Sequence, residues 1–332
     1  MAIGCRRAWN CGVVAFALAL AAPGGNRLSA LDFPRIFNHH ALPEIAGDEM
    51  REEERISEAL DRNADYRAYF QSVRNPEVRL QALVRPGEEL IYQARWRGLP
   101  AGNLRLLAKR QTTLRGRRVF VFELDVESND FLSAFYPVSN SMNSYVDAAS
   151  GRSYLLRRRI SERNRQYKDR LEFKYDSRLA NGLPNPVSSY SLVDGLGRET
   201  VGRPIPISGD MQDVVSAIYY LRGLELRRPG DECAILLGGR RRPVLVRISV
   251  TGEERLEVPG LGAFDCLVIE PNAEGANLSG NPLATRGGEK VWLEKHCLVP
   301  IQVEAELPRP LGSVIATLAE VKNHDLQRHA VK

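Results

Sequence analysis

The sequence predicts a mainly β protein, with an antiparallel curved sheet of half-barrel or sandwich-like form packed on one central helix near residues 211–222. Two patterns favour this class. Apolar and polar residues alternate along much of the chain from residue 88 onward, which is typical of strands with one buried face. The strongest helical spacing lies in residues 210–224, where apolar side chains recur at i, i+3, i+4 and i+7: Met211, Val214, Val215, Ile218 and Leu221.

The ends of this helix can be placed from the chemistry of its flanking residues. Asp210 precedes it and can accept hydrogen bonds from the first free N–H groups. Gly223 follows it and can adopt the left-handed conformation that ends many helices. A helix of about three turns is marginal in isolation. We therefore expect its apolar side to pack on the sheet.

The first thirty residues have the pattern of a secretory signal peptide. Arg6 and Arg7 provide the positive start, and residues 12–22 form an apolar run that is short for a membrane span. We expect cleavage after Ala21 or Ala30 and export to the periplasm or cell envelope. A retained membrane anchor is the alternative.

Residues 31–84 predict an irregular lead-in with a charged surface helix at 48–72. Three strands follow, separated by turns at 98–102 and 114–117, and together they predict an antiparallel meander. Their inward-facing residues are Leu90, Tyr92, Ala94 and Trp96, then Leu104, Leu106 and Ala108, then Phe120, Phe122, Leu124 and Val126.

The rest of the β-rich domain, residues 85–322, divides at a segment rich in Gly and Pro, residues 177–209, where two halves meet. Residues 323–332 form a polar tail. The further strands are expected at 138–147, 152–160 and 166–176 before this segment, and at 232–238, 243–251, 254–258, 263–270, 289–294, 299–306 and 312–321 after the helix.

An ordered set of short motifs resembles a known family of exported bacterial proteins, domain of unknown function 3108. The motifs are Pro86-Gly87-Glu88 to Trp96 with Gly102, residues 213–222 (DVVSAIYYLR), Arg228-Pro229-Gly230, residues 260–268 (GLGAFDCLV), Val291-Trp292-Leu293, Pro300 and Gly312-Ser313. The resemblance spans roughly residues 85–322. It implies an exported β-rich domain, similar to the curved sheets around a helix in periplasmic lipoprotein carriers. It brings no activity with it, and Glu294-Lys295-His296 replaces the family's usual aspartate pair.

Catalytic motifs are missing from the sequence. The β-rich domain holds one histidine, His296, and the adjacent Cys297 points to the opposite face of a strand, so the two cannot form a catalytic pair. This favours a protein without catalytic activity. A hydrolase acting on cell-wall or lipid material remains the alternative.

No spacing of Cys, His, Asp or Glu predicts a metal site, and no motif predicts a cofactor. Cys233, Cys266 and Cys297 remain after export. They form either one disulfide with one free thiol or three buried thiols. Glu123, Asp125 and Glu127 share a strand face that could present oxygen ligands to a cation. Pairing with Arg105 and Lys109 across the hairpin explains them better.

The arginine-rich run Arg157, Arg158 and Arg159 is compatible with contact to an anionic envelope surface, but a solvated strand face explains it better. Its lack of interleaved aromatic residues argues against nucleic acid. A scaffold with a basic docking face is therefore a further alternative. The preferred hypothesis is an envelope protein that binds a lipid or other amphiphile. Its ligand-binding candidates are Trp96, Tyr219, Tyr220 and Trp292, which serve either as pocket walls or as ordinary core.

The signal peptide generates the first prediction. The N-terminus of protein recovered from an envelope fraction should begin at Ala22 or Leu31, because cleavage follows Ala21 or Ala30. N-terminal sequencing measures this directly. Recovery of a chain that still begins at Met1 from the cytoplasm would contradict export.

Overall fold

The computed structural model describes residues 75–134, 136–163, 165–207, 209–239, 243–274, 289–306 and 313–331. The predicted signal peptide and the charged helix at 48–72 lie outside these residues. None of the helices in the described ranges has the length and apolar character to cross a membrane.

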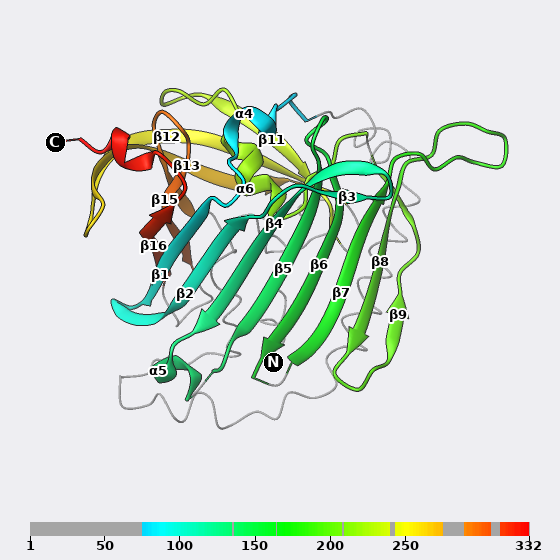
Figure 1. Cartoon of the computed structure of the whole chain (residues 1–332), viewed down its shortest axis with the longest axis horizontal. Helices are drawn as coiled ribbons and strands as arrows, with labels where there is room; N and C mark the ends of the chain where they lie inside the picture. The colour runs from blue at the N-terminus through cyan, green and yellow to red at the C-terminus, as the bar shows by residue number, and fades with distance from the viewer. Residues whose placement is uncertain are drawn as a thin grey trace, which may run out of the picture.

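Within the described residues, sixteen strands form one sheet (Figure 1). The first run contains β1 Glu89–Trp96, β2 Leu99–Ala108, β3 Thr112–Leu114, β4 Arg117–Ser128, β5 Ser139–Asp147, β6 Ser153–Glu162, β7 Arg165–Lys174, β8 Val187–Asp194, β9 Glu199–Val201 and β10 Ile205–Pro206. The second contains β11 Glu232–Leu237, β12 Val244–Val258, β13 Gly262–Glu274, β14 Lys290–Glu294, β15 Pro300–Glu306 and β16 Ser313–Lys322. The helices are α4 Leu80–Leu83, α5 Asp130–Ser133, α6 Ser216–Leu221 and the 3-10 turn η5 Leu326–His329.

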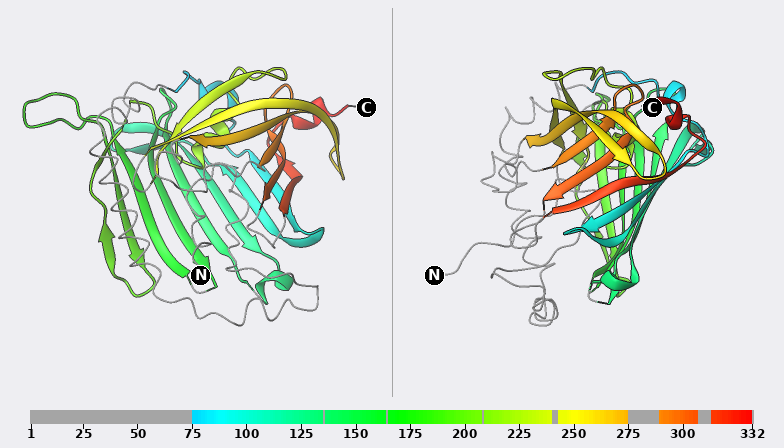
Figure 2. Two further views of the ribbon diagram at one scale, coloured as in Figure 1. Left: turned by 180° about the vertical axis from the view of Figure 1, so that it is seen from behind. Right: turned by 90° about the vertical axis from the view of Figure 1, so that its left-hand side faces the viewer.

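The two runs join along one pair of strands, which we name the seam: β1 and β16. The strand order is β10-β8-β7-β6-β5-β4-β2-β1-β16-β15-β14-β13-β12-β11, and all these pairs are antiparallel. The sheet curves, so that the second run crosses over the upper end of the first (Figure 2). The predicted fold class, a mainly β antiparallel curved sheet packed on a central helix, is confirmed.

The alternation of apolar residues explains the first strands. Every second residue of β1, from Leu90 to Trp96, is buried, and so is the predicted face of β2. In β4 the residues from Val119 to Phe122 are buried on both faces, and Val126 of the predicted face is half-buried. Gly98 and Gly116 adopt φ values of 80° and 78° in the turns that follow β1 and β3. These are conformations that glycine adopts at low cost.

Two predicted strands, 243–251 and 254–258, form one strand, β12. Its register shifts between Val250 and Gly252 where it pairs with β13. A bulge inserts a residue into a strand and lets the chain continue past it. The break in alternation around Gly252 marks this bulge, and the prediction of two strands there was wrong.

Helix α6 is shorter than predicted and has different ends. Asp210 does not cap it, because its carboxylate pairs with Arg152 at 2.5 Å. Asp213 instead accepts hydrogen bonds from the N–H groups of Val215 and Ser216, at 2.9 and 3.0 Å. Gly223 is not left-handed. A Cβ added there would lie 2.2 Å from Cγ1 of Val78, so close packing requires glycine at this position.

The helix is buried on all sides, although its apolar residues follow the spacing of a single helical face. All six of its residues are buried. The side away from the sheet is covered by the segment before β1, which includes Val78 and α4. This covering segment comes from elsewhere in the chain and cannot be inferred from helical periodicity.

The Gly- and Pro-rich residues 177–209 contain β8, β9 and β10. A boundary between two halves there stays a prediction. The polar tail packs back onto the sheet: Leu326 is fully buried, and the N–H of Val331 donates to the carbonyl of Ala263 at 2.7 Å.

The contact between Gly223 and Val78 generates the second prediction. Gly223→Ala should lower the free energy of unfolding by about 1–3 kcal/mol, because the added methyl group overpacks the space between α6 and the covering segment. Urea denaturation measures the change. Gly252→Ala is the matched control, since a Cβ there would meet nothing within 4 Å. Equal stability of the two variants would contradict the packing argument.

Candidate functional site

Asp213 anchors the start of α6 to the face of the sheet on which this helix packs, which we name the inner face. Its carboxylate accepts hydrogen bonds from the hydroxyl groups of Ser144 on β5 and Ser153 on β6, and from two N–H groups of its own helix. Burial raises the pKa of this carboxyl group, and these donors counteract the effect. Both carboxylate oxygens of Asp213 thus accept hydrogen bonds that hold the helix in place. This makes Asp213 poorly suited to act as a catalytic base.

The other end of α6 carries a buried ion pair with the strand seam. The guanidinium of Arg222, 3% exposed, donates to both carboxylate oxygens of Glu88, which is fully buried immediately before β1. A second contact from Nη2 of Arg222 reaches the carbonyl of Leu83 at 2.8 Å. An ion pair held by two hydrogen bonds fixes the orientation of the guanidinium as well as its distance from the carboxylate.

His324, which follows β16, completes this buried charge cluster. Its Nε2 lies 3.2 Å from Nη2 of Arg222. Arginine can only donate, so Nε2 accepts and the ring proton resides on Nδ1. Burial lowers the pKa of His324 below its usual value. The cluster therefore joins α6, the start of β1 and the end of β16.

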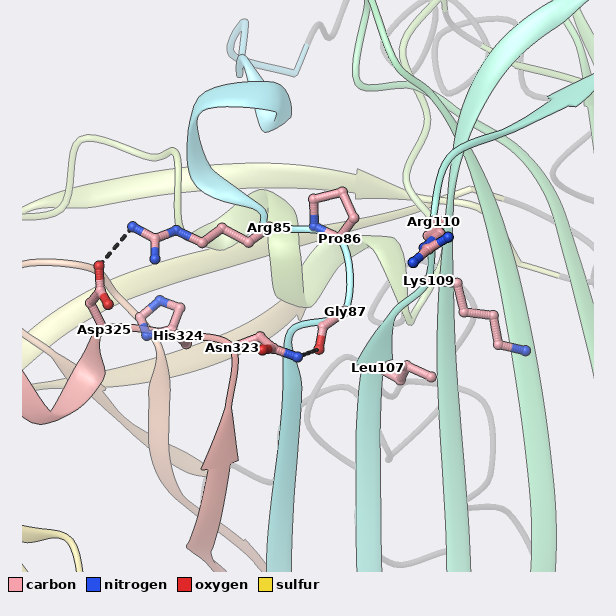
Figure 3. A pocket seen from close by; sticks show the side chains of 9 residues that line it. All are labelled: Arg85, Pro86, Gly87, Leu107, Lys109, Arg110, Asn323, His324 and Asp325. Carbon is pink, nitrogen blue, oxygen red and sulfur yellow. Dashed lines mark hydrogen bonds and ion pairs between the residues drawn. The ribbon is translucent and has the colours of Figure 1, made fainter.

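An open pocket of about 650 Å³ lies beside this cluster, at the end of the seam (Figure 3). Its lining is mostly polar and comprises Arg85, Pro86, Gly87, Leu107, Lys109, Arg110, Asn323, His324 and Asp325. Arg85 pairs with Asp325 at 2.7 Å, and the Asn323 amide donates to the carbonyl of Gly87 at 2.8 Å. These contacts hold the segment after β16 against the start of β1.

The structure places the predicted ligand-binding tyrosines inside the core. The ring of Tyr219 stacks on Phe122, with centroids 3.8 Å apart. Tyr220 is 2% exposed and donates to the carbonyl of Pro76. Both rings thus pack against protein.

The two predicted tryptophans do not share a face of the sheet. Trp96 is in register with Val314 and lies on the same side as Tyr92 and Ala94. Trp292 is in register with Gln302, which pairs with Thr317, and its indole N–H donates to Glu254 at 2.8 Å. Thr317 in turn pairs with Gln93, on the opposite side of β1 from Ala94. A ligand-binding role for the four aromatic residues stays a prediction, but the structure does not bring them together.

The three predicted surface arginines also separate. Arg157 and Arg159 are exposed on the outer face of β6, where they pair in register with Arg170 and Lys168 of β7. Arg158 points to the inner face and forms a two-point pair with Asp169, at 2.8 and 2.6 Å. An anionic partner surface stays a prediction, and only Arg157 and Arg159 of the three face outward.

The acidic face of β4 behaves as the sequence indicated. Arg105 lies 3.1 Å from Glu123 and 3.3 Å from Asp125, and Lys109 also pairs with Glu123. The predicted cross-strand pairing is confirmed for these two acids.

Beyond α6, the inner face of the first run carries a row of side chains that includes both apolar and charged residues. Strand pairing places Leu124, Met142, Arg158, Asp169 and Leu192 side by side across β4 to β8. Met142 and Leu192 are half-buried. Asp169 is 1% exposed, and its charge holds the pKa of Arg158 above the usual range. The row combines apolar side chains with a fixed guanidinium.

The structure brings together one group of side chains that sequence spacing missed. The ligand atoms of Glu294, His296 and His329 all lie within 4.8 Å of one another. His329 is 33 positions from His296 in the chain, and no local motif signals their contact.

The three mature cysteines form no disulfide with one another in the structure. Burial raises the pKa of Cys233 to about 11, and burial followed by nearby carboxylates raises those of Cys266 and Cys297 to about 12. All three thiols are unpaired, as in the second alternative, but only Cys266 is buried and the other two are half-buried. Such thiols are poor nucleophiles at neutral pH.

Together the fold and these sites define a mainly β protein whose long antiparallel sheet curves around a helix held at both ends by buried polar contacts. The family described as protein of unknown function DUF3108 matches residues 91–319, more than half of the chain, and the chain belongs to this family. The resemblance of the ordered motifs is thus confirmed.

Two solved structures show a distant likeness. One is a β-barrel-like protein of domain of unknown function DUF1849 from Brucella abortus, with 10% identity over 73% of this chain and 100% of that chain, at a TM-score of 0.43. Another is the hypothetical lipoprotein YmcC from Escherichia coli, with 11% identity over 85% of this chain and 98% of that chain, at a TM-score of 0.25. A search of curated proteins gave no match. At these scores the likenesses do not bear on what this chain binds.

The buried ion pair generates the third prediction. Arg222→Met should lower the free energy of unfolding by about 3–5 kcal/mol, because it leaves the carboxylate of Glu88 buried without its partner. The double variant Glu88→Met with Arg222→Met should cost less than the sum of the two single variants. Chemical denaturation of all four proteins gives the coupling energy. Additive losses would show that the pair does not couple the helix to the seam.

Proposed function

We propose that this protein is an exported, non-enzymatic protein of the cell envelope that binds an amphiphilic ligand on the inner face of β4 to β8. The observation that carries the proposal is the row in which Met142 and Leu192 flank the ion pair of the half-buried Arg158 with the buried Asp169. Ligand sites are mostly apolar with a few placed polar groups. This row has both components on one face.

The apolar part of the row extends to neighbouring positions. Val126, Tyr190 and Tyr167 lie on the same side of the sheet and are half-buried. Half-buried apolar side chains on an inner face can gain further burial from an acyl chain, at roughly 25 cal/mol per Å² of apolar surface. A ligand tail laid across β4 to β8 would contact these residues.

The charged part of the row supplies a fixed donor for a head group. Arg158 is held by two hydrogen bonds to Asp169, and Asp169 also accepts from the hydroxyl of Tyr190 at 3.4 Å. A guanidinium fixed in this way presents its remaining N–H groups in one direction. Oxygen atoms of a carboxylate or phosphate head group suit such a donor.

The buried acids support a non-enzymatic role. Asp213 is saturated by hydroxyl and N–H donors, and Glu88 is engaged by Arg222. A catalytic acid or base must keep a lone pair or a proton available to substrate. The buried carboxylates at the two ends of α6 are committed to holding that helix.

Binding to the inner face generates the fourth prediction. The wild-type protein should bind an environment-sensitive fluorescent fatty acid saturably, and Met142→Asp should weaken the affinity by roughly tenfold or more, because it places a charge among the apolar side chains. Fluorescence titration measures the dissociation constant.

Asn143→Asp is the matched control, since its side chain adds the same charge one residue along β5, on the opposite face of the sheet. Circular dichroism establishes that both variants are folded. Absence of saturable binding to the wild type, or equal losses in the two variants, would overturn the proposal.

A further inference from the structure

We propose that Glu294, His296 and His329 bind a divalent metal ion of the zinc type, which fastens the end of the chain to the turn between β14 and β15. The three residues present one carboxylate oxygen and two imidazole nitrogens within 4.8 Å of one another. This site is separate from the inner face of β4 to β8, and the proposal does not depend on amphiphile binding.

The turn holds the carboxylate in place. Glu294 is the last residue of β14 and is 1% exposed. One of its oxygens, Oε2, accepts from the N–H groups of His296 and Cys297, at 2.9 and 2.7 Å. Leu298 closes the turn with a φ of 53° and donates its N–H to the carbonyl of Glu294 at 2.8 Å. Hydrogen bonds to a ligating carboxylate fix its direction and support binding.

A second anchored segment supplies the other histidine. Leu326 is fully buried at the start of η5, and Val331 donates to Ala263 just beyond it. His329 lies between these two anchors. Its ring is 5.4 Å from that of His296, with 23° between the ring planes. The backbone thus holds the two imidazoles next to each other through contacts that do not involve a metal.

The donor set selects the class of metal. Two imidazole nitrogens with one carboxylate oxygen suit zinc and related transition metals, whereas Mg²⁺ and Ca²⁺ take oxygen ligands. Zinc sites with three protein ligands keep one position open for water. His296 is exposed, so solvent can reach that position.

The distances require only a local adjustment. Zinc binds nitrogen and carboxylate oxygen at about 2.0–2.2 Å, so donors on one ion lie within roughly 4 Å of each other. The longest separation here is no more than 4.8 Å. Rotation of the two histidine side chains, of which His296 is exposed and His329 half-buried, can supply the remaining ångström or less while Glu294 stays in its turn.

Isothermal titration with ZnCl₂ gives the fifth prediction. The experiment uses the whole chain, purified through a histidine-free tag, with His39→Gln and His40→Gln as background substitutions that remove two adjacent histidines outside the described residues. We expect one ion per chain. His296→Gln and His329→Gln should each reduce the affinity roughly tenfold or more, and MgCl₂ should give no saturable binding.

Lys295→Gln and Arg328→Gln are the matched controls, because each changes the residue next to one ligand and neither supplies a donor in the group. Both should bind zinc as the background protein does. Co²⁺ gives a second readout, since two nitrogen donors should produce a visible absorption spectrum that His329→Gln abolishes. Zinc should also raise the melting temperature of the background protein but not of His329→Gln.

Failure of the background protein to bind zinc would overturn the proposal. So would unchanged affinity in a folded variant that lacks both His296 and His329.

Discussion

The buried pair of Glu88 and Arg222 is the contact on which the arrangement of the two strand runs depends. Glu88 leads directly into β1, and Arg222 ends the helix that connects the first run to the second. Removing both charges from water is costly, and the cost is offset only when the geometry is good and the remaining donors are satisfied. The further bonds from Nη2 of Arg222 to Leu83 and His324 contribute to this, while Nε of Arg222 is buried without a hydrogen-bond partner among the described residues. The pair thus specifies one position of α6 relative to the seam.

This constraint explains why α6 is enclosed. With Asp213 bonded to β5 and β6 at one end, and Arg222 bonded to the start of β1 at the other, the helix lies across several strands. The covering segment then closes the remaining side, where Gly223 permits contact with Val78. The helix fills one end of the inner face, and the row containing Met142 continues beyond it. Core and candidate site are therefore adjacent parts of one surface.

The sequence predicted most of the strands because their apolar residues alternate with period two, as from Leu90 to Trp96 and from Phe120 to Leu124. The alternation of apolar and polar residues can be read from a short stretch of sequence, because a strand with one buried face needs an apolar residue at every second position. The bulge at Gly252 disturbed the pattern and was mistaken for a strand end. Family resemblance identified the family but carried no information about sites.

The candidate sites could not be predicted because they depend on register and on contacts between distant residues. Trp96 and Trp292 both lie in strands, but their faces follow from pairing across β16 and β15, which neither segment encodes alone. The arginines were limited in the same way. Alternation predicts that Arg158 points to the other face of the sheet from Arg157 and Arg159, but it does not show which face is the inner one. His329 meets His296 only because the end of the chain turns back onto β13.

The segment after β16 has the composition of a polar tail, but its residues make long-range contacts on which the structure depends. Asn323 bonds to Gly87, His324 enters the buried charge cluster, and Asp325 pairs with Arg85, so three consecutive residues secure the seam from one side. Leu326 then anchors the turn that carries His329 to Glu294. Polar composition indicated exposure, but each of these polar groups has a specific partner. A metal ion at His329 would thus add to an attachment that the protein contacts already define.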